Sequence, residues 1–189
     1  MTREELEHAI RAACDVAQDD AVYVFGSQAI LGQFPAAPAA LRQSVEVDVA
    51  PVTRIDRIDN IDGSLGELSQ FHQTHGFYVH GLPIESATLP MGWQERLVPV
   101  RDDIGTRGKT GWCLEGHDLA ASKLVAFRDK DRDFVRVLLV KGLVKPRTLR
   151  ARIATLGIPP EERERLSEWV RLTSPGLRGP TRARRKRGR

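Results

Sequence analysis

The central sheet of this chain is predicted from two stretches, Val22-Tyr23-Val24-Phe25-Gly26-Ser27-Gln28-Ala29-Ile30-Leu31 and Ser44-Val45-Glu46-Val47-Asp48-Val49. The first begins as a β-branched and aromatic run, which is typical of a buried strand, and Gly26 breaks it. The second alternates valines with polar residues, so its valines face one side of a strand and its acids face the other. Together they predict two strands, one ending in a Gly-Ser turn and the other carrying paired carboxylates.

The turn and the acids form a candidate phosphate and metal site. Gly26 has no Cβ, so a phosphate can approach the backbone there, and Ser27 adds a hydroxyl beside backbone amides. Glu46 and Asp48 point the same way, about 7 Å apart along the strand. Carboxylates so placed repel each other unless a cation lies between them, and Mg²⁺ takes oxygen ligands. Each motif alone fits an ordinary turn or a solvated strand face better than a functional site, and their order and spacing bring the two interpretations level.

A lysine in an apolar helix face is the second candidate. The residues three and four positions from Lys123 are all apolar: Leu119, Ala120, Ala126 and Phe127. Asp118 is the expected N-cap of this helix. The lysine either extends past the core edge or points at an anion. The charge block 128–133 that follows is typical of an exposed turn with ion pairs.

These motifs resemble the signature of the nucleotidyltransferase superfamily related to DNA polymerase beta. The matching segments are Phe25-Gly26-Ser27-Gln28-Ala29-Ile30-Leu31-Gly32, Glu46-Val47-Asp48 and His117-Asp118-Leu119-Ala120-Ala121-Ser122-Lys123-Leu124. Over most of residues 20–140 the chain is similar to small bacterial nucleotidyltransferases grouped with AbiEii-type and MenT-type toxins. Two positions depart from the pattern. Glu46 stands where many members have aspartate, and the later strand that usually supplies a third carboxylate holds His80, so the third metal ligand is unassigned.

The resemblance implies an α/β or α+β fold, in which a nucleotidyltransferase-like mixed sheet is flanked by helices and followed by a C-terminal helical part. It implies transfer of a nucleoside monophosphate from an NTP to a hydroxyl, with Glu46 and Asp48 as ligands of Mg²⁺ or Mn²⁺. The implied catalytic residues are Glu46, Asp48, Lys123 and Asp131, and the implied nucleotide-binding residues are Gly26, Ser27, Lys123 and Arg128. By the same resemblance, the acceptor is a tRNA 3′ end and the protein is a toxin restrained by an antitoxin protein.

Length and charge indicate the domain organisation. The 189 residues suffice for a core over 1–140, helices packed on it over 141–175, and a basic tail over 176–189. The net charge of +4 arises in the tail, since residues 177–189 hold seven cations and no acid, and without them the chain carries about −3. The tail is expected to stay unfolded and to contact phosphates, the alternative being a solubilising end. Its nucleic-acid-binding candidates are Arg182, Arg184, Arg185, Lys186 and Arg187.

Periodicity predicts further strands near 77–82, 97–100 and 111–114, and helices that open at Pro146 and at Pro159-Pro160. Cys14 and Cys113 lie in apolar contexts, and neither a signal peptide nor a membrane-length apolar run is recognisable. A cytoplasmic protein with free, buried thiols and no membrane partner is therefore expected.

Two other functions stay open at this level. The first is a non-catalytic module with this fold that binds nucleic acid or a protein, which Glu46 and the missing third acid favour. The second is transfer of the nucleotide to a protein or a small molecule by the same phosphate chemistry.

Overall fold

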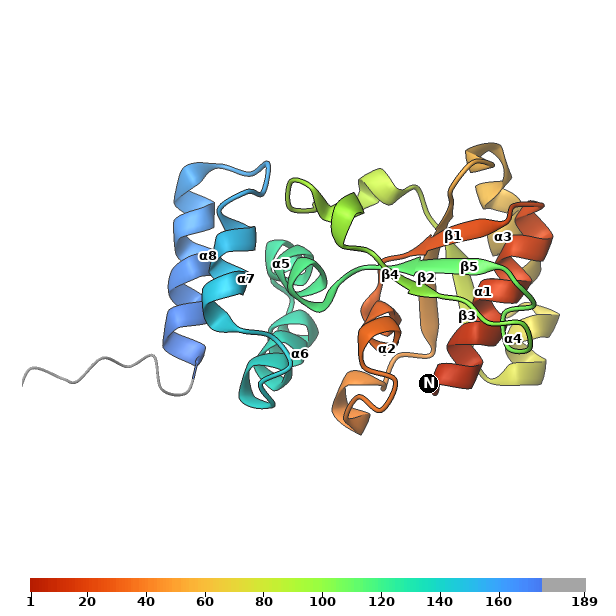
Figure 1. Ribbon diagram of the computed structural model, residues 1–189, viewed down its shortest axis with the longest axis horizontal. Helices are drawn as coiled ribbons and strands as arrows, with labels where there is room; N and C mark the ends of the chain where they lie inside the picture. The colour runs from red at the N-terminus through yellow and green to blue at the C-terminus, as the bar shows by residue number, and fades with distance from the viewer. Residues whose placement is uncertain (175–189) are drawn as a thin grey trace, which may run out of the picture.

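The computed structural model describes residues 1–174 as a five-stranded mixed sheet flanked by helices (Figure 1). The strands are β1 (Ala21–Val24), β2 (Glu46–Pro51), β3 (Tyr78–Gly81), β4 (Val98–Val100) and β5 (Thr110–Cys113), in the order β3-β2-β1-β5-β4. The pairs β1–β2 and β4–β5 are antiparallel, whereas β1–β5 and β2–β3 are parallel. The expected α/β fold class is therefore confirmed.

Side-chain alternation along the two central strands separates the core from the site. The buried positions are Val22, Val24, Val47 and Val49. Because Val24 is in register with Val49, these side chains share one face of the sheet. Glu46 and Asp48 lie between them in sequence and therefore point from the opposite face, where both stay partly exposed. The predicted orientation of the two acids is correct.

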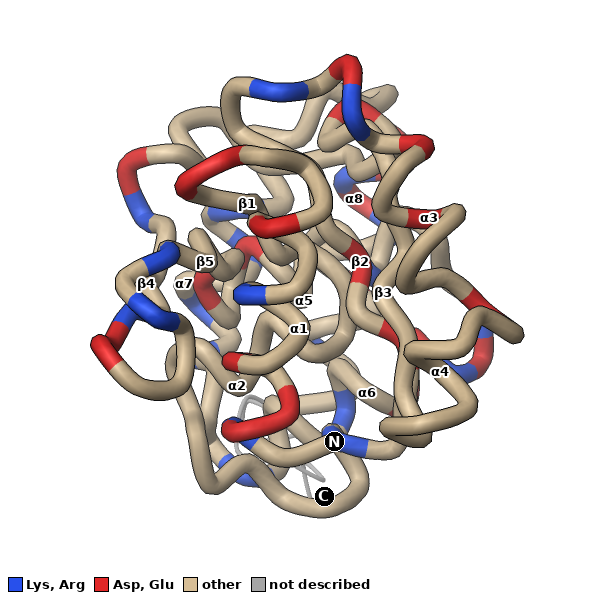
Figure 2. Tube along the Cα trace, turned by 90° about the vertical axis from the view of Figure 1, so that its right-hand side faces the viewer, with Lys and Arg blue, Asp and Glu red and all other residues tan. Residues whose placement is uncertain are grey.

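The valine face is covered by α1 (Arg3–Ala17), α3 (Ile58–Leu65) and α4 (Gln70–His75) (Figure 1). Helix α1 begins at a capping box, in which the Thr2 hydroxyl accepts from the Glu5 amide and the Glu5 carboxylate accepts from the Thr2 amide. Viewed from this side, acidic and basic residues are interspersed along the chain (Figure 2). Residues of both signs are therefore mixed along the chain in this view (Figure 2).

Helix α2 (Ile30–Gln33) lies against α1, whose Arg3 side chain donates to the backbone oxygens of Leu31 and Gly32. The remaining part of the molecule is built from the C-terminal helices (Figure 1). These helices are α5 (Gly116–Ala126), α6 (Asp129–Val140), α7 (Pro146–Ile153) and α8 (Pro160–Thr173). Helix α5 packs against α6 and α7, and α8 packs on α7 (Figure 1). The helices predicted to open at prolines begin at Pro146 and Pro160.

Asp118 is not the N-cap of its helix, which corrects the sequence-based prediction. The N-cap is Glu115, whose carboxylate accepts hydrogen bonds from the amides of His117 and Asp118. Asp118 is fully buried and accepts from Arg96 Nε at 2.7 Å, while Arg152 Nε lies 3.1 Å from its other oxygen. The helix starts earlier than expected because the longer glutamate side chain reaches the free amides, and Asp118 instead joins α5 to α7 and to the segment before β4.

Within residues 1–174 both cysteines are free and buried. Burial raises the pKa of each thiol to about 12, so neither is suited to be a nucleophile at neutral pH. Across the same residues no helix combines the length and the apolarity needed to cross a membrane. The tail candidates Arg182, Arg184, Arg185, Lys186 and Arg187 lie outside the described residues.

Candidate active site

A cleft of about 1040 Å³ lies between the open face of the sheet and helices α5 and α6. Its lining includes every predicted site residue within the described part of the chain: Gly26, Ser27, Glu46, Asp48, Lys123, Arg128 and Asp131. The structure thus brings together segments that are far apart in sequence. The chemical roles of these residues stay predictions.

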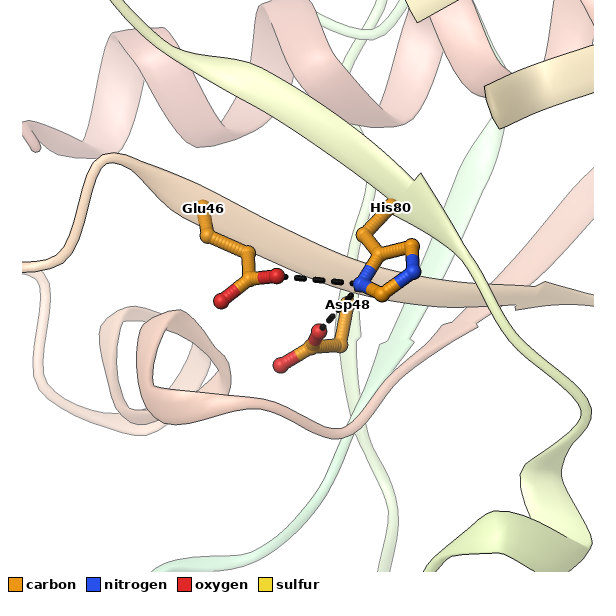
Figure 3. Close-up of side chains that lie close together, drawn as sticks. All are labelled: Glu46, Asp48 and His80. Carbon is orange, nitrogen blue, oxygen red and sulfur yellow. Dashed lines mark hydrogen bonds and ion pairs between the residues drawn. The ribbon is translucent and has the colours of Figure 1, made fainter. Parts of the chain in front are cut away.

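The sheet wall of the cleft carries three side chains of the types that can ligate a metal ion. Glu46 and Asp48 come from β2, and His80 comes from β3, where it is in register with Asp48. His80 Nδ1 lies 3.0 Å from Glu46 Oε1 and 3.7 Å from Asp48 Oδ1, and one donor atom from each residue lies within 4.8 Å of the others. Figure 3 shows the imidazole directed at both carboxylates. The sequence offered no third acid for this site, and in the structure the imidazole nitrogen of His80 stands beside the two carboxylates instead.

This cluster fits a divalent cation by its chemistry. Burial, followed by the charge of Glu46, raises the pKa of Asp48 to about 6, so the pair is held together at an electrostatic cost. Two carboxylates and one imidazole can all ligate first-row divalent ions. All three side chains remain between about a fifth and a third exposed, which leaves space for further ligands from solvent or substrate.

Gly26 lets the acidic cluster lie directly against the turn. A Cβ at this position would come within 1.8 Å of Asp48 Oδ2, although the backbone has an ordinary negative φ of −78°. The glycine thus allows close approach by the Asp48 carboxylate, and its predicted role in admitting a phosphate stays a prediction. Ser27 follows as the first residue of a short 3₁₀ helix and faces the same cleft. A phosphate bound at Ser27 would therefore lie beside Asp48.

The helix wall carries an internally compensated charge cluster. Asp131 is fully buried and accepts from Lys123 Nζ at 3.2 Å and from Arg128 Nε at 2.6 Å. Burial acts to raise the pKa of Asp131, but these two cations outweigh it and hold the pKa below its ordinary value. Lys123 also lies 4.8 Å from the centre of the Phe134 ring. Asp131 therefore fixes the lysine at the cleft wall.

The environment of Lys123 distinguishes the two interpretations of this residue. Its side chain is only 12% exposed, so it does not extend past the core into solvent. Burial lowers its pKa, and Asp131 offsets part of that effect. Asp48 lies near enough to act in the same direction as Asp131. Lys123 thus lines the cleft while its ammonium group binds the buried Asp131.

A third wall was missed by sequence reasoning. The loop before β2 carries no recognisable motif, but its residues Ala40, Leu41, Gln43 and Ser44 line the cleft. Its short 3₁₀ helix, Ala39–Leu41, contacts α6. Gln28 anchors the loop, since the fully buried amide donates from Nε2 to the backbone oxygen of Ser44 at 2.9 Å. A glutamine directly after the Gly-Ser turn was the available signal, because a buried amide in that position needs a backbone partner. Lys130, which the sequence places in the charge block 128–133, also lines the cleft.

Comparison with known proteins assigns the chain to a family. The family model described as "Nucleotidyltransferase of unknown function" (DUF6036) matches residues 4–171. The match supports nucleotidyl transfer in general and does not single out the AbiEii or MenT type. No curated protein and no solved structure matches the chain.

Proposed function

The chain belongs to the nucleotidyltransferases of unknown function grouped as DUF6036, and on this basis we propose that it moves a nucleoside monophosphate from an NTP to a hydroxyl acceptor, releasing pyrophosphate. One observation carries the proposal. A single cleft joins the carboxylates of β2, the turn at Gly26 and Ser27, and the buried pair of Lys123 with Asp131. Transfer of a phosphoryl group depends mainly on positioning and on compensating negative charge, and the cleft offers both.

In this proposal each wall has its own task. Glu46 and Asp48, with His80 beside them, would hold a divalent ion, Mg²⁺ or Mn²⁺, which when bound activates the attacking oxygen and neutralises charge at the α-phosphate. Ser27 and the adjacent amides would hold the triphosphate by hydrogen bonds. Lys123, fixed by Asp131, and the more exposed Arg128 would offset the negative charge of the phosphates.

The proposed acceptor is an RNA, in particular a tRNA 3′ end, and the proposed biological role is that of a toxin restrained by an antitoxin. The similarity of the motifs to AbiEii-type and MenT-type toxins supports both. The cations of residues 177–189 also suit a polyanionic acceptor, since neutralising phosphates supplies affinity without reading sequence.

The direct test is incorporation of label. Wild-type protein is incubated with each α-labelled NTP, Mg²⁺ or Mn²⁺, and total tRNA, beside Glu46→Ala and Asp48→Ala variants. Label should enter tRNA with the wild type and with neither variant. Label that appears only when proteins or small hydroxyl compounds are added would redirect the acceptor. Absence of label with every acceptor class, in wild type as in the variants, would favour a binding module without turnover.

The tail is tested separately. Deletion of residues 177–189 should weaken RNA binding and reduce its dependence on salt, because fewer counterions are released. The readout is the slope of log affinity against log salt concentration, measured by fluorescence anisotropy. An unchanged slope would exclude the tail from acceptor binding while leaving the proposed chemistry intact.

A further inference from the structure

The residue that distinguishes this metal cluster is His80. It lies on β3, which pairs with β2 in parallel, and the register sets it directly beside Asp48. Parallel pairing keeps the side chains of Asp48 and His80 on the same face of the sheet. Glu46, two residues before Asp48, shares that face. Three donors are therefore brought to one point by backbone pairing alone, without a loop that must fold around the ion.

The distances suit direct ligation by the imidazole. First-row divalent ions bind oxygen and nitrogen donors at about 2.1 Å, which puts neighbouring donors about 3 to 3.6 Å apart. The observed separations from His80 Nδ1 are 3.0 Å to Glu46 Oε1 and 3.7 Å to Asp48 Oδ1. The nitrogen nearest the acids is also the one that Figure 3 shows facing them, so no ring flip is needed. An alternative role for His80 is a hydrogen bond from Nδ1 to Glu46 Oε1 with no ion between them.

The identity of the donor matters for the identity of the ion. Mg²⁺ is a hard cation that prefers oxygen ligands and gives up water reluctantly, whereas imidazole nitrogen suits first-row transition ions. Two carboxylates with one imidazole form a mixed set, which retains the oxygen donors that Mn²⁺ favours and adds a nitrogen donor that Mg²⁺ binds poorly. From this donor set we infer that His80 Nδ1 is the third protein ligand and that the site selects a first-row transition ion, with Mn²⁺ preferred over Mg²⁺.

The inference shares its cleft with the proposed function and rests on it for its biological meaning, but it is tested by binding alone. Full-length protein is stripped with EDTA and titrated with Mn²⁺, with and without competing Mg²⁺, while electron paramagnetic resonance reports free Mn²⁺. Electron spin echo envelope modulation of the bound ion then reports whether a ¹⁴N nucleus is coordinated. The variants are His80→Asp, which restores an all-oxygen set, and His75→Ala, which removes an exposed imidazole on α4 as the matched control.

The wild type and His75→Ala should show ¹⁴N coupling from a ligated imidazole, and His80→Asp should not. His80→Asp should also lower the preference for Mn²⁺ over Mg²⁺ by about tenfold, because an oxygen donor replaces the nitrogen donor. A wild-type spectrum without ¹⁴N coupling, or no Mn²⁺ binding at all, would overturn the inference whatever the variants do. An unchanged metal preference in a folded His80→Asp variant would overturn it as well. Nitrogen coupling without any nucleotidyl transfer would leave this inference standing and reject the proposed reaction.

Discussion

The two walls of the cleft handle buried charge in opposite ways. On the sheet wall, Asp48 lies close to a second acid, and burial with that acid raises its pKa to about 6. On the helix wall, Asp131 is even less exposed, yet Lys123 and Arg128 hold its pKa below the ordinary value. Both carboxylates have lost solvent, but only Asp131 has gained close permanent cations from its own chain.

The two walls therefore differ in what stabilises their buried charges. A fully compensated buried cluster is complete when the chain has folded, and its members act as a rigid support. A cluster of like charges is stable only at a cost, which an external cation relieves. A bound cation would thus relieve the repulsion on the sheet wall, whereas the helix wall already holds Lys123 in place by its pairing with Asp131. Removing a residue from each wall should therefore have different consequences.

The largest effect is expected at Asp48, and it should fall on activity rather than on stability. Asp48→Asn removes an ion ligand, and because a bound ion is worth several kcal/mol to the reaction, transfer of label to tRNA should fall about 10³-fold. The free energy of unfolding of the metal-free protein should change by less than about 1 kcal/mol, since the substitution also removes repulsion from Glu46. Denaturation in EDTA and the incorporation assay measure the two quantities. A large loss of metal-free stability would contradict the contrast between the walls.

At Asp131, by contrast, the expected effect of substitution falls on stability. Asp131→Asn leaves Lys123 buried without its counterion, so the free energy of unfolding should fall by about 3 kcal/mol in urea denaturation, with or without metal. Asp133→Asn is the matched control, because that acid is 69% exposed and its loss should cost no more than about 0.5 kcal/mol. Equal costs for the two variants would mean that the helix wall is not a buried support.

The same pair predicts a pH dependence. The folded protein holds the pKa of Asp131 below 3.8, so its stabilisation is present at neutral pH, where the unfolded chain is also ionised. It is lost only as the pH falls below 3.8 through the lowered folded-state pKa. The difference in unfolding free energy between wild type and Asp131→Asn should therefore be constant from pH 7 to 5 and shrink in strong acid. If the difference in unfolding free energy between the two proteins already decreases near pH 6, a group other than Asp131 is responsible for the pH dependence.

Gly26 tests the contact between the turn and the sheet wall. In Gly26→Ala the new Cβ would meet the Asp48 carboxylate, so the clash should cost about 2 kcal/mol of stability and should weaken Mn²⁺ binding by displacing that ligand. Gly63→Ala is the control, since a Cβ there meets nothing within 4 Å and a glycine-to-alanine change inside α3 should stabilise by about 0.5 to 1 kcal/mol. Calorimetric melting and metal titration give both readouts. Wild-type metal affinity in Gly26→Ala would show that Asp48 can move away freely.

The smallest effect is expected at Arg128. Its side chain is 61% exposed, so its ion pair with Asp131 should contribute less than about 1 kcal/mol to stability. If it contacts the triphosphate, Arg128→Ala should raise the KM for NTP roughly tenfold through loss of a charge-assisted hydrogen bond. Arg136→Ala, within α6 but outside the cleft lining, should leave KM unchanged. If wild type, Arg128→Ala and Arg136→Ala have similar KM values, Arg128 does not contact the triphosphate, and Lys123 is the remaining candidate on the helix wall.

The paired acids of β2 and the buried lysine of α5 were predictable because their signals are local. Strand side chains alternate with a period of two, so the sequence around Glu46 and Asp48 is enough to put both on one face. Helical spacing likewise gives Lys123 its apolar neighbours. Asp118 was misjudged because two nearby acids can each cap a helix, and only the folded chain shows which side chain meets the free amides.

Residue order alone therefore predicted the strands, several of the helices and the chemical types on each face of the two central strands, because these depend on backbone periodicity and on neighbours within a few positions. Tertiary structure alone decided that His80 completes the cluster, since this requires β3 to pair with β2 in one register across some thirty residues of chain. The same holds for Gln28 anchoring the third wall and for Gly26 making room for Asp48. Such contacts depend on how distant segments pack together, which is set by the whole core and by no single motif.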